Sequence, residues 1–475
     1  MKTVFLRLAS VLLALTFACA APAYARGRDL FAVAAEDQLP QGEVIDKVAC
    51  KSDPTQSYAL FLPPGYTADK KWPILYAFDP VARGTVPVKL FKDAAEKFGY
   101  IVAGSNNSRN GIDISEIVKT LWADTHGRFS IDERRVYTTG FSGGARVASA
   151  VALSYRDAVA GAIVASGGPR PNVNLSSSQL VFFATAGTED FNFPEMQQLA
   201  RRLDALGVTH RLVVFEGSHE WPPAEVCGDA IAWMEVQAMK AGTRAKDDTL
   251  IDERLKLQLN RARDYEASQK SYEAYLEYEA LVMEFRGLRD VNEFAAEAAR
   301  LKSSKEVKAA IKSELAEEND QTSLLAKLQT LFAQLKDASV YPETMVELKA
   351  NLSDIAKKAD ESKSVAERRV AHRVVQALRV QMYEEAFALR QRKDYASVPA
   401  KLGLVAMISP KDPRVFYDLA TAYARAGNKG RATAALGKAI ERGFSDLARI
   451  EQNEDFAILR NDAAYKKIVA ALKKS

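Results

Sequence analysis

Ser142 lies in the stretch GFSGG (residues 140–144), which fits the pattern G-x-S-x-G. A strand-like run ends at Gly140, and a helix-compatible run of small residues begins near Gly144. In that context the pattern places a serine hydroxyl on a sharp turn above a sheet, and small flanking residues keep strand and helix from colliding. The stretch therefore predicts a nucleophile. Glycine-flanked serines also occur in ordinary turns, so the prediction needs a base and an acid to support it.

The base is sought among only four histidines. His219 follows the strand-like run VVFEGS, at the sheet end where Ser142 is expected. His126 precedes the serine, and His210 opens a strand at the opposite end. His372 falls in a helical pattern much later in the chain, where we expect a packing or surface residue. Only His219 has the place that a general base needs in the order serine, acid, histidine.

The acid is sought after the strand that precedes the histidine strand. LVFFATAGTEDFNF offers Glu189 and Asp190 just past that strand. Asp190 fits better, because it stands past the turn glycine with its carboxylate aimed inward, and Glu189 is the second candidate. The loop of the strand before, ASGGPRPNV, carries no acid. The predicted triad is therefore Ser142, Asp190 and His219.

An oxyanion hole needs two N–H donors beside the nucleophile. The first is predicted to be the N–H of Gly143. The second should come from the loop after the strand PILYAF, which reads DPVARG. Pro80 has no N–H to donate, so Val81 is the expected second donor.

Substrate-binding residues are less well marked. Trp221 follows the predicted base closely and could form a wall of the pocket or pack under its loop. Asn107, in the loop SNNSRNG, could bind a polar substrate or form turn hydrogen bonds. Arg146 is expected to pair with a carboxylate of the scaffold. No Cys/His spacing resembles a metal site, and no cofactor is expected.

The elements that must position these residues occupy residues 44–240, where short apolar runs alternate with helical stretches. Seven strands are expected there, at 58–62, 74–78, 100–104, 136–140, 160–166, 181–186 and 211–216. Such alternation predicts an α/β fold with a mostly parallel, doubly covered sheet. Ligands of such sheets bind beyond the carboxyl ends of the strands.

The residue composition and the hydrophobic pattern change after a predicted linker at 241–248. Alanine, leucine and charged residues then dominate, which predicts an all-α part with a helical region at 249–378 and helical repeats at 379–475. Residues 413–443 resemble a tetratricopeptide repeat (TPR), with packing positions at Phe416, Leu419, Ala420, Tyr423, Gly427, Ala432, Leu436 and Ala439. A weaker copy lies one period upstream. The charged segment 304–370 is expected to form a long exposed helical hairpin.

Together, YALFLPPGY, WPILYAFDP, GFSGG, GTEDFNF and GSHEWPP make residues 44–240 resemble a secreted α/β-hydrolase. The similarity is to the branch that holds feruloyl and acetyl-xylan esterases and polyhydroxybutyrate depolymerases. It implies hydrolysis of carboxylic esters through an acyl-enzyme, with Ser142, Asp190 and His219 in their named roles. One departure is that Asp79-Pro80 stands where those esterases carry His-Gly.

The N-terminus predicts export. Residues 1–25 have a basic start, a short apolar run and an A-x-A site, which is typical of a secretory signal peptide, and residues 26–43 form an extension. The apolar run is too short to span a bilayer, so a periplasmic or secreted protein without a membrane span is expected. Cys50 and Cys227 could then form a disulfide or remain two buried thiols. The net charge of +4 over 475 residues gives no sign of nucleic-acid binding.

Three functions remain open from the sequence. The first is an exported serine esterase that acts on a small-molecule or polymer-linked ester, with the repeats binding a protein partner or a second copy. The second is a catalytically weak hydrolase-like scaffold whose repeats are the binding module. The third is a peptidase, which would share the triad, although no access-restricting domain is present in the sequence.

Overall fold

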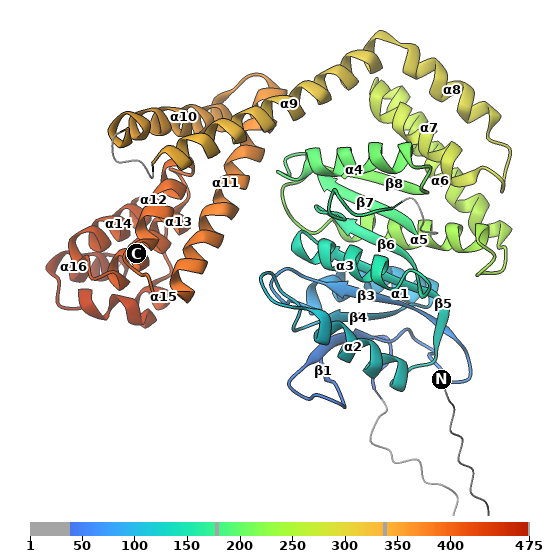
Figure 1. Cartoon of the computed structure of the whole chain (residues 1–475), viewed down its shortest axis with the longest axis horizontal. Helices are drawn as coiled ribbons and strands as arrows, with labels where there is room; N and C mark the ends of the chain where they lie inside the picture. The colour runs from blue at the N-terminus through green and yellow to red at the C-terminus, as the bar shows by residue number, and fades with distance from the viewer. Residues whose placement is uncertain (1–38, 176–179, 336–339, 474–475) are drawn as a thin grey trace, which may run out of the picture. The chain divides into compact units, whose positions relative to one another are not determined.

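A single sheet forms the centre of the first half of the molecule. The structure, a computed structural model, describes residues 39–175, 180–335 and 340–473. Eight strands pair in the order β1-β2-β4-β3-β5-β6-β7-β8. The pairs β1–β2 and β2–β4 are antiparallel, and the five other pairs are parallel. With helices on both faces (Figure 1), this is the α/β-hydrolase fold, so the predicted fold class is confirmed.

The elements of this half alternate along the chain. The strands are β1 (Val44–Ala49), β2 (Ser57–Phe61), β3 (Trp72–Phe78), β4 (Ile101–Ser105), β5 (Ile131–Phe141), β6 (Val159–Ala165), β7 (Val181–Gly187) and β8 (His210–Phe215). The helices are α1 (Thr85–Phe98), α2 (Ser115–Arg128), α3 (Gly143–Ser154), α4 (Phe193–Ala205) and α5 (Ala224–Lys240). Seven of these strands overlap the predicted runs, whereas β1 was missed.

One face of the sheet packs against α1 and α5. Leu75, Tyr137 and Phe183 point to this face and share a fully apolar cluster with Phe91 of α1 and Trp233 of α5. Every residue of β3 is buried, as expected for a central strand that is covered on both faces.

The opposite face carries α2, α3 and α4. Tyr76, the neighbour of Leu75 on β3, stacks on Trp122 of α2 with ring centroids 5.2 Å apart. Thr138 of β5 donates to the carbonyl of Ala148 in α3 over 3.0 Å. Because successive strand residues point to opposite faces, one sheet serves both layers.

The second half is all helical. Its helices are α6 (Asp248–Ala267), α7 (Ser271–Phe285), α8 (Asn292–Ser303), α9 (Lys305–Gln334), α10 (Tyr341–Glu361), α11 (Val365–Gln391), α12 (Val398–Ile408), α13 (Pro413–Arg425), α14 (Lys429–Glu441), α15 (Leu447–Gln452), the 3-10 helix η2 (Glu454–Leu459) and α16 (Ala463–Leu472). The predicted all-α part is therefore confirmed, whereas its division into a linker, a helical region and repeats stays a prediction.

The segment 304–370 forms two long helices, α9 and α10, that contact each other, but their apolar stripes are buried rather than exposed. Leu328 of α9, together with Leu348 and Leu352 of α10, is buried in a cluster with Val374 and Leu378 of α11. Most charged residues of α9 and α10 are exposed, while Glu317 is buried. The expectation of full exposure weighed overall charge above the spacing of the leucines.

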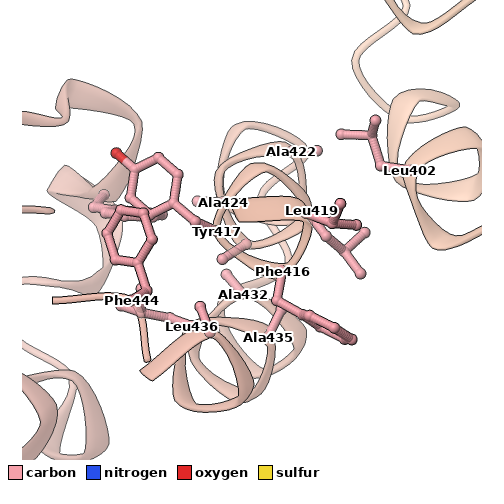
Figure 2. Close-up of a cluster of buried hydrophobic side chains, with 14 of the residues drawn as sticks. Leu402, Phe416, Tyr417, Leu419, Ala422, Ala424, Ala432, Ala435, Leu436 and Phe444 are labelled. Carbon is pink, nitrogen blue, oxygen red and sulfur yellow. The ribbon is translucent and has the colours of Figure 1, made fainter. Parts of the chain in front are cut away.

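The repeat-like segment packs around α13 (Figure 2). Leu419 and Ala422 face Leu402 of α12, while the ring of Tyr417 lies on the Phe444 ring with centroids 4.5 Å apart. The predicted packing positions at residues 416, 419, 420, 432, 436 and 439 are all buried, and Gly427 has a φ of 78° in the turn between α13 and α14. This helix pair has the packing expected of a repeat unit, and membership in the TPR class remains a prediction.

Both cysteines of the described chain are free. Cys50 follows β1 and Cys227 lies in α5, and each is at most 2% exposed. Burial raises the pKa of the Cys50 thiol to about 11 and also raises that of Cys227. Of the two alternatives that the sequence left open, the structure contains the separate buried thiols.

The predicted signal peptide, residues 1–25, and residues 26–38 of the predicted extension lie outside the described residues. Within the described ranges, no helix combines the length and the apolar character needed to cross a bilayer.

Candidate active site

The turn between β5 and α3 holds Ser142 in an unusual backbone conformation. Its φ of 53° and ψ of −119° lie in a region that non-glycine residues seldom adopt. The N–H of Ser142 donates to the carbonyl of Ala165 at the end of β6 over 2.8 Å, which fastens the turn to the neighbouring strand. A strained serine at a strand–helix corner is the geometry that the G-x-S-x-G pattern predicts.

The flanking glycines are required by close backbone contacts. A Cβ at Gly140 would lie 2.1 Å from the carbonyl oxygen of Gly144, and one at Gly144 would lie 2.0 Å from the carbonyl oxygen of Phe78. Both distances are far inside van der Waals contact. The expectation that the positions two before and two after the serine must be small is confirmed, and Gly144 also lets the turn approach the end of β3.

Three predicted residues meet at the carboxyl edge of the parallel strands. Nε2 of His219 lies 2.9 Å from the Oγ of Ser142, and Nδ1 lies 2.8 Å from the Oδ1 of Asp190. Ser142 follows β5, Asp190 follows β7 and His219 follows β8. With the ring proton on Nδ1 donating to Asp190, Nε2 is free to accept the hydroxyl proton of Ser142. This arrangement can generate a serine nucleophile.

The histidine ring is fixed on both sides by aromatic residues. Its centroid lies 4.7 Å from that of Phe141 and 4.1 Å from that of Phe191. The side chain is only 12% exposed. Neither aromatic residue was expected from the sequence, although Phe141 sits inside the GFSGG stretch and Phe191 directly follows the acid. Their contacts restrict the ring to orientations that point Nε2 toward the serine.

Asp190 is fully buried in a short, well-bonded loop. Its Oδ1 also accepts from the backbone N–H of Asn192 over 2.7 Å, and Asn192 itself donates through Nδ2 to the carbonyl of Ser166. Its Oδ2 has no hydrogen-bond partner in the described protein. The second candidate acid, Glu189, points elsewhere, because its Oε2 lies 2.8 Å from Nδ1 of His372.

On the other side of Ser142, the loop after β3 forms a network of its own. Asp79 is fully buried, and its carboxylate accepts from the Arg83 guanidinium, from Nε1 of Trp221 at 2.9 Å and from the N–H of Val81 at 3.0 Å. Burial works against the charged form. The hydrogen bonds from Arg83, Trp221 and Val81 outweigh that effect and hold the pKa of Asp79 below its usual value.

The N–H of Val81, the predicted second oxyanion donor, therefore already donates a hydrogen bond to Asp79. The N–H of Val81 points at Asp79 Oδ1 rather than toward Ser142, and the Val81 residue is 61% exposed. The offset from the strand end did suggest Val81, but an Asp two residues earlier captures that N–H in a local turn. These contacts do not support Val81 as a donor. Gly143, at the first turn of α3, keeps the expected position beside the serine.

Of the loop SNNSRNG, Asn110 rather than Asn107 reaches the serine turn. A Cβ on Gly143 would lie 1.8 Å from Asn110 Oδ1, so the exposed Asn110 side chain covers this glycine. The carboxamide of Asn107 instead accepts from the N–H of Ser57 over 2.8 Å and donates to the carbonyl of Thr55. These scaffold bonds do not support substrate binding by Asn107, which stays a prediction. Asn110 belongs to the loop that the sequence marked, but nothing distinguished it there.

Two other side chains lie close to the turn. Trp221 donates to Asp79 and its ring centroid lies 5.8 Å from that of Phe141, so it packs between the loops after β3 and β8. Its predicted substrate contact stays a prediction. Arg146 makes two bonds of 2.8 Å to Glu195 of α4, which confirms its pairing with a scaffold carboxylate. No group of three or more potential metal ligands occurs among the described residues.

Comparisons with known proteins give distant structural matches. No protein-family model matches the chain, and no curated protein matches its sequence. The chain is similar to the fluorophosphonate-binding serine hydrolase F of Staphylococcus aureus, at 14% identity and a TM-score of 0.33, covering 38% of this chain and 92% of that one. It is also similar to an esterase of Pyrobaculum calidifontis, at 14% identity and a TM-score of 0.35, over 42% and 87%.

A third match is a mutant of the feruloyl esterase module from Clostridium thermocellum complexed with sinapinate. It shares 15% identity and a TM-score of 0.34, over 40% of this chain and 85% of that one. At such low identity and TM-score, these likenesses say nothing about the activity of this chain. The class that the fold defines is the α/β-hydrolase class, and the reaction has to be inferred from the site.

Proposed function

We propose that the chain hydrolyses carboxylic esters through an acyl-enzyme on Ser142. The observation that carries this proposal is the continuous hydrogen-bond chain from Ser142 Oγ through His219 to the buried Asp190, with distances of 2.9 and 2.8 Å. A serine needs a base and the base needs an orienting group, and both are in place. The strained turn that presents Ser142 supports the same role.

The reaction runs in two halves. In the first, His219 accepts the Ser142 proton on Nε2 while Oγ attacks the ester carbonyl carbon, and a tetrahedral oxyanion forms. The C–O bond to the alcohol then breaks, and His219 returns its proton to the departing alcohol oxygen. In the second half, water attacks the acyl group with His219 as base, which releases the acid and restores Ser142. The carboxylate of Asp190 stabilises the imidazolium.

The N–H of Gly143 at the start of α3 is the proposed donor to the oxyanion. A helix N-terminus also favours developing negative charge. Because Pro80 lacks an N–H and that of Val81 binds Asp79, the loop after β3 offers the oxyanion little help in this conformation. This favours esters over amides as substrates, since an ester carbonyl is intrinsically more reactive than an amide carbonyl and its hydrolysis needs less stabilisation of the oxyanion. It also weighs against the peptidase.

The test uses two measurements on the same protein. Wild type should hydrolyse short p-nitrophenyl esters and bind a fluorophosphonate probe covalently, and Ser142→Ala should lose at least about 10³-fold in rate and all labelling. Circular dichroism and thermal unfolding of the variant should match wild type. Activity retained in Ser142→Ala would exclude this mechanism. A panel of feruloyl, acetyl-sugar and hydroxyalkanoate esters would then define the acyl and alcohol groups.

The scaffold hypothesis makes the opposite prediction for the probe, because a serine without catalytic function is not labelled. In that case the repeat-like helices would carry the function by binding a protein partner.

Export is a further proposal, and residues 1–25 support it by their sequence alone. Secretion of the chain in a bacterial host followed by N-terminal sequencing should find a mature end near Arg26. A mature chain that retains its first residues would contradict export.

A further inference from the structure

Arg373 of α11 binds the loop that carries the acid of the triad. Its Nε and Nη2 both donate to the carbonyl oxygen of Thr188, over 2.9 and 2.6 Å. Its guanidinium lies 4.1 Å from the ring centroid of Phe193, at the start of α4, and 3.4 Å from Glu317 of α9. Only 2% of the Arg373 residue is exposed. A long-range contact thus binds the backbone two residues before Asp190.

Gln321 of α9 binds the same loop on the other side of the acid. Its Nε2 donates to the carbonyl oxygen of Phe191 over 2.7 Å, and the residue is 3% exposed. Phe191 is the aromatic residue whose ring lies 4.1 Å from that of His219. The carbonyls on both sides of Asp190 are therefore held by side chains from the helical half.

Gln376 of α11 contacts the base directly. Its Oε1 accepts from the backbone N–H of His219 over 3.2 Å. It stands one helical turn beyond Arg373, so both side chains project from one face of α11. One helix thereby bonds to the acid loop and to the base loop.

The cost of burying a charged side chain indicates that the contacts of Arg373 are specific. A buried guanidinium is costly unless it is paired and hydrogen-bonded. Burial lowers the pKa of Arg373 to about 10, so the group is still charged at neutral pH. Its charge interacts favourably with Asp190, one of whose oxygens has no hydrogen-bond partner in the described protein.

We propose that Gln321, Arg373 and Gln376, here named the helical clamp, are positioning residues for the triad. They hold the loops of Asp190 and His219 at the separation that lets Nε2 reach Ser142. None of the three bonds to a triad side chain, so each acts through the backbone or through Phe191. The inference rests on the proposed ester hydrolysis, and it makes the helical half part of the catalytic apparatus rather than an appendage.

The first test compares two glutamines on one helix. Gln376→Ala should lower kcat for a short p-nitrophenyl ester about 10-fold with KM within about twofold, because base alignment changes while ester binding does not. Gln381→Ala is the matched control, since Gln381 bonds to Glu385 of its own helix and its loss should leave kcat unchanged. Gln376→Glu keeps an acceptor oxygen at the same length and should restore kcat to within about threefold of wild type.

The second test concerns Arg373. Arg373→Ala should lower kcat about 100-fold, and Arg373→Lys, which keeps the charge but loses the paired donors, should fall between this variant and wild type. Should Arg373→Ala not fold, the Gln376 series still decides the proposal. Equal kcat values in Gln376→Ala and Gln381→Ala would overturn it.

Hydrogen exchange separates this inference from the proposed function. Amides of residues 188–193 and 217–221 should exchange faster in Gln376→Ala and Arg373→Ala than in Gln381→Ala. Unchanged exchange would overturn the clamp, whatever the activity. A wild type that is inert toward esters and the probe would overturn the proposed function and, with it, the catalytic role of the clamp, while faster exchange would still show that the contacts hold the loops.

Discussion

The two sides of Ser142 use their polar atoms in different ways. On the triad side, Oγ, the two ring nitrogens of His219 and Oδ1 of Asp190 form a line that ends at the nucleophile. On the β3 side, Asp79 accepts hydrogen bonds from Arg83, the indole of Trp221 and the N–H of Val81.

The difference separates the groups of the proposed reaction from groups that hold a loop. Asp79 has hydrogen bonds to both carboxylate oxygens, whereas Asp190 leaves Oδ2 without a partner in the described structure. Two buried aspartates at the same edge of one sheet thus differ in their bonding, and we assign Asp190 to the proposed reaction and Asp79 to holding its loop.

Asp190→Asn should have the largest effect and probes the reactive side. Loss of the carboxylate leaves His219 in the wrong tautomer and its imidazolium without support, so kcat should fall about 10⁴-fold with the fold intact. Glu189→Gln is the comparison, and it should cost less than about tenfold because Glu189 pairs with His372 instead. A larger loss in Glu189→Gln than in Asp190→Asn would reverse the assignment of the acid.

Gly144→Ala tests the contact where the two sides meet. Its Cβ would lie 2.0 Å from the carbonyl oxygen of Phe78, a backbone atom that cannot rotate away, so we expect a loss of about 3 kcal/mol in the free energy of unfolding. Gly143→Ala makes the same change at the preceding residue. Its Cβ would meet the Asn110 side chain, which can turn toward solvent. Urea unfolding of the two variants should show the smaller loss for Gly143→Ala.

Asp79→Ala probes the structural side. The N–H of Val81 and the indole N–H of Trp221 would lose their acceptor, whereas the half-exposed Arg83 can hydrate, so we expect a loss of about 2–3 kcal/mol at pH 7. Because the folded pKa of Asp79 is depressed, its contribution is complete above the unfolded pKa of about 3.9 and is lost as pH falls through the folded value. Urea unfolding of wild type and variant should therefore converge in strong acid. A constant difference across that range would contradict the assignment.

Trp221→Phe should have the smallest effect. The ring contact with Phe141 is kept and one hydrogen bond to Asp79 is lost, which should cost about 1 kcal/mol of stability. KM for short esters should stay within about twofold in steady-state assays. A tenfold rise in KM at unchanged stability would instead place Trp221 in the substrate pocket, as the sequence first suggested.

Two kinds of feature could be predicted from the sequence: contiguous motifs, and residues identified by their order along the chain. The buried runs of β3 and β7 and the GFSGG turn are contiguous patterns, and the shortage of histidines left His219 as the only base in the right place. The edge strand β1 was missed because VIDKVA lacks a buried run and its pairing with β2 is irregular. The donor at Val81 stays a prediction that the structure does not support, because the Asp79 side chain two residues away accepts its N–H.

The helical clamp was beyond the reach of such patterns. Arg373 contacts a residue 185 positions earlier in the chain, and Gln376 contacts one 157 positions earlier. A helical arginine or glutamine looks the same in sequence whether it faces solvent or a catalytic loop. Such long-range contacts depend on how the two halves fold together, and the hydrophobic periodicity of a sequence does not predict them.

The two buried thiols have a use that is independent of the chemistry of the site. The thiolate is the form that attacks thiol reagents, so neither buried cysteine reacts until the chain around it opens. Cys50 follows the edge strand β1, whereas Cys227 lies on the buried side of α5 in the core. In a chain that begins at Arg26, labelling at Cys50 reports opening of the sheet edge and labelling at Cys227 reports unfolding of the central core. The protein thus carries built-in reporters of two opening events, and mass spectrometry could follow both in one sample.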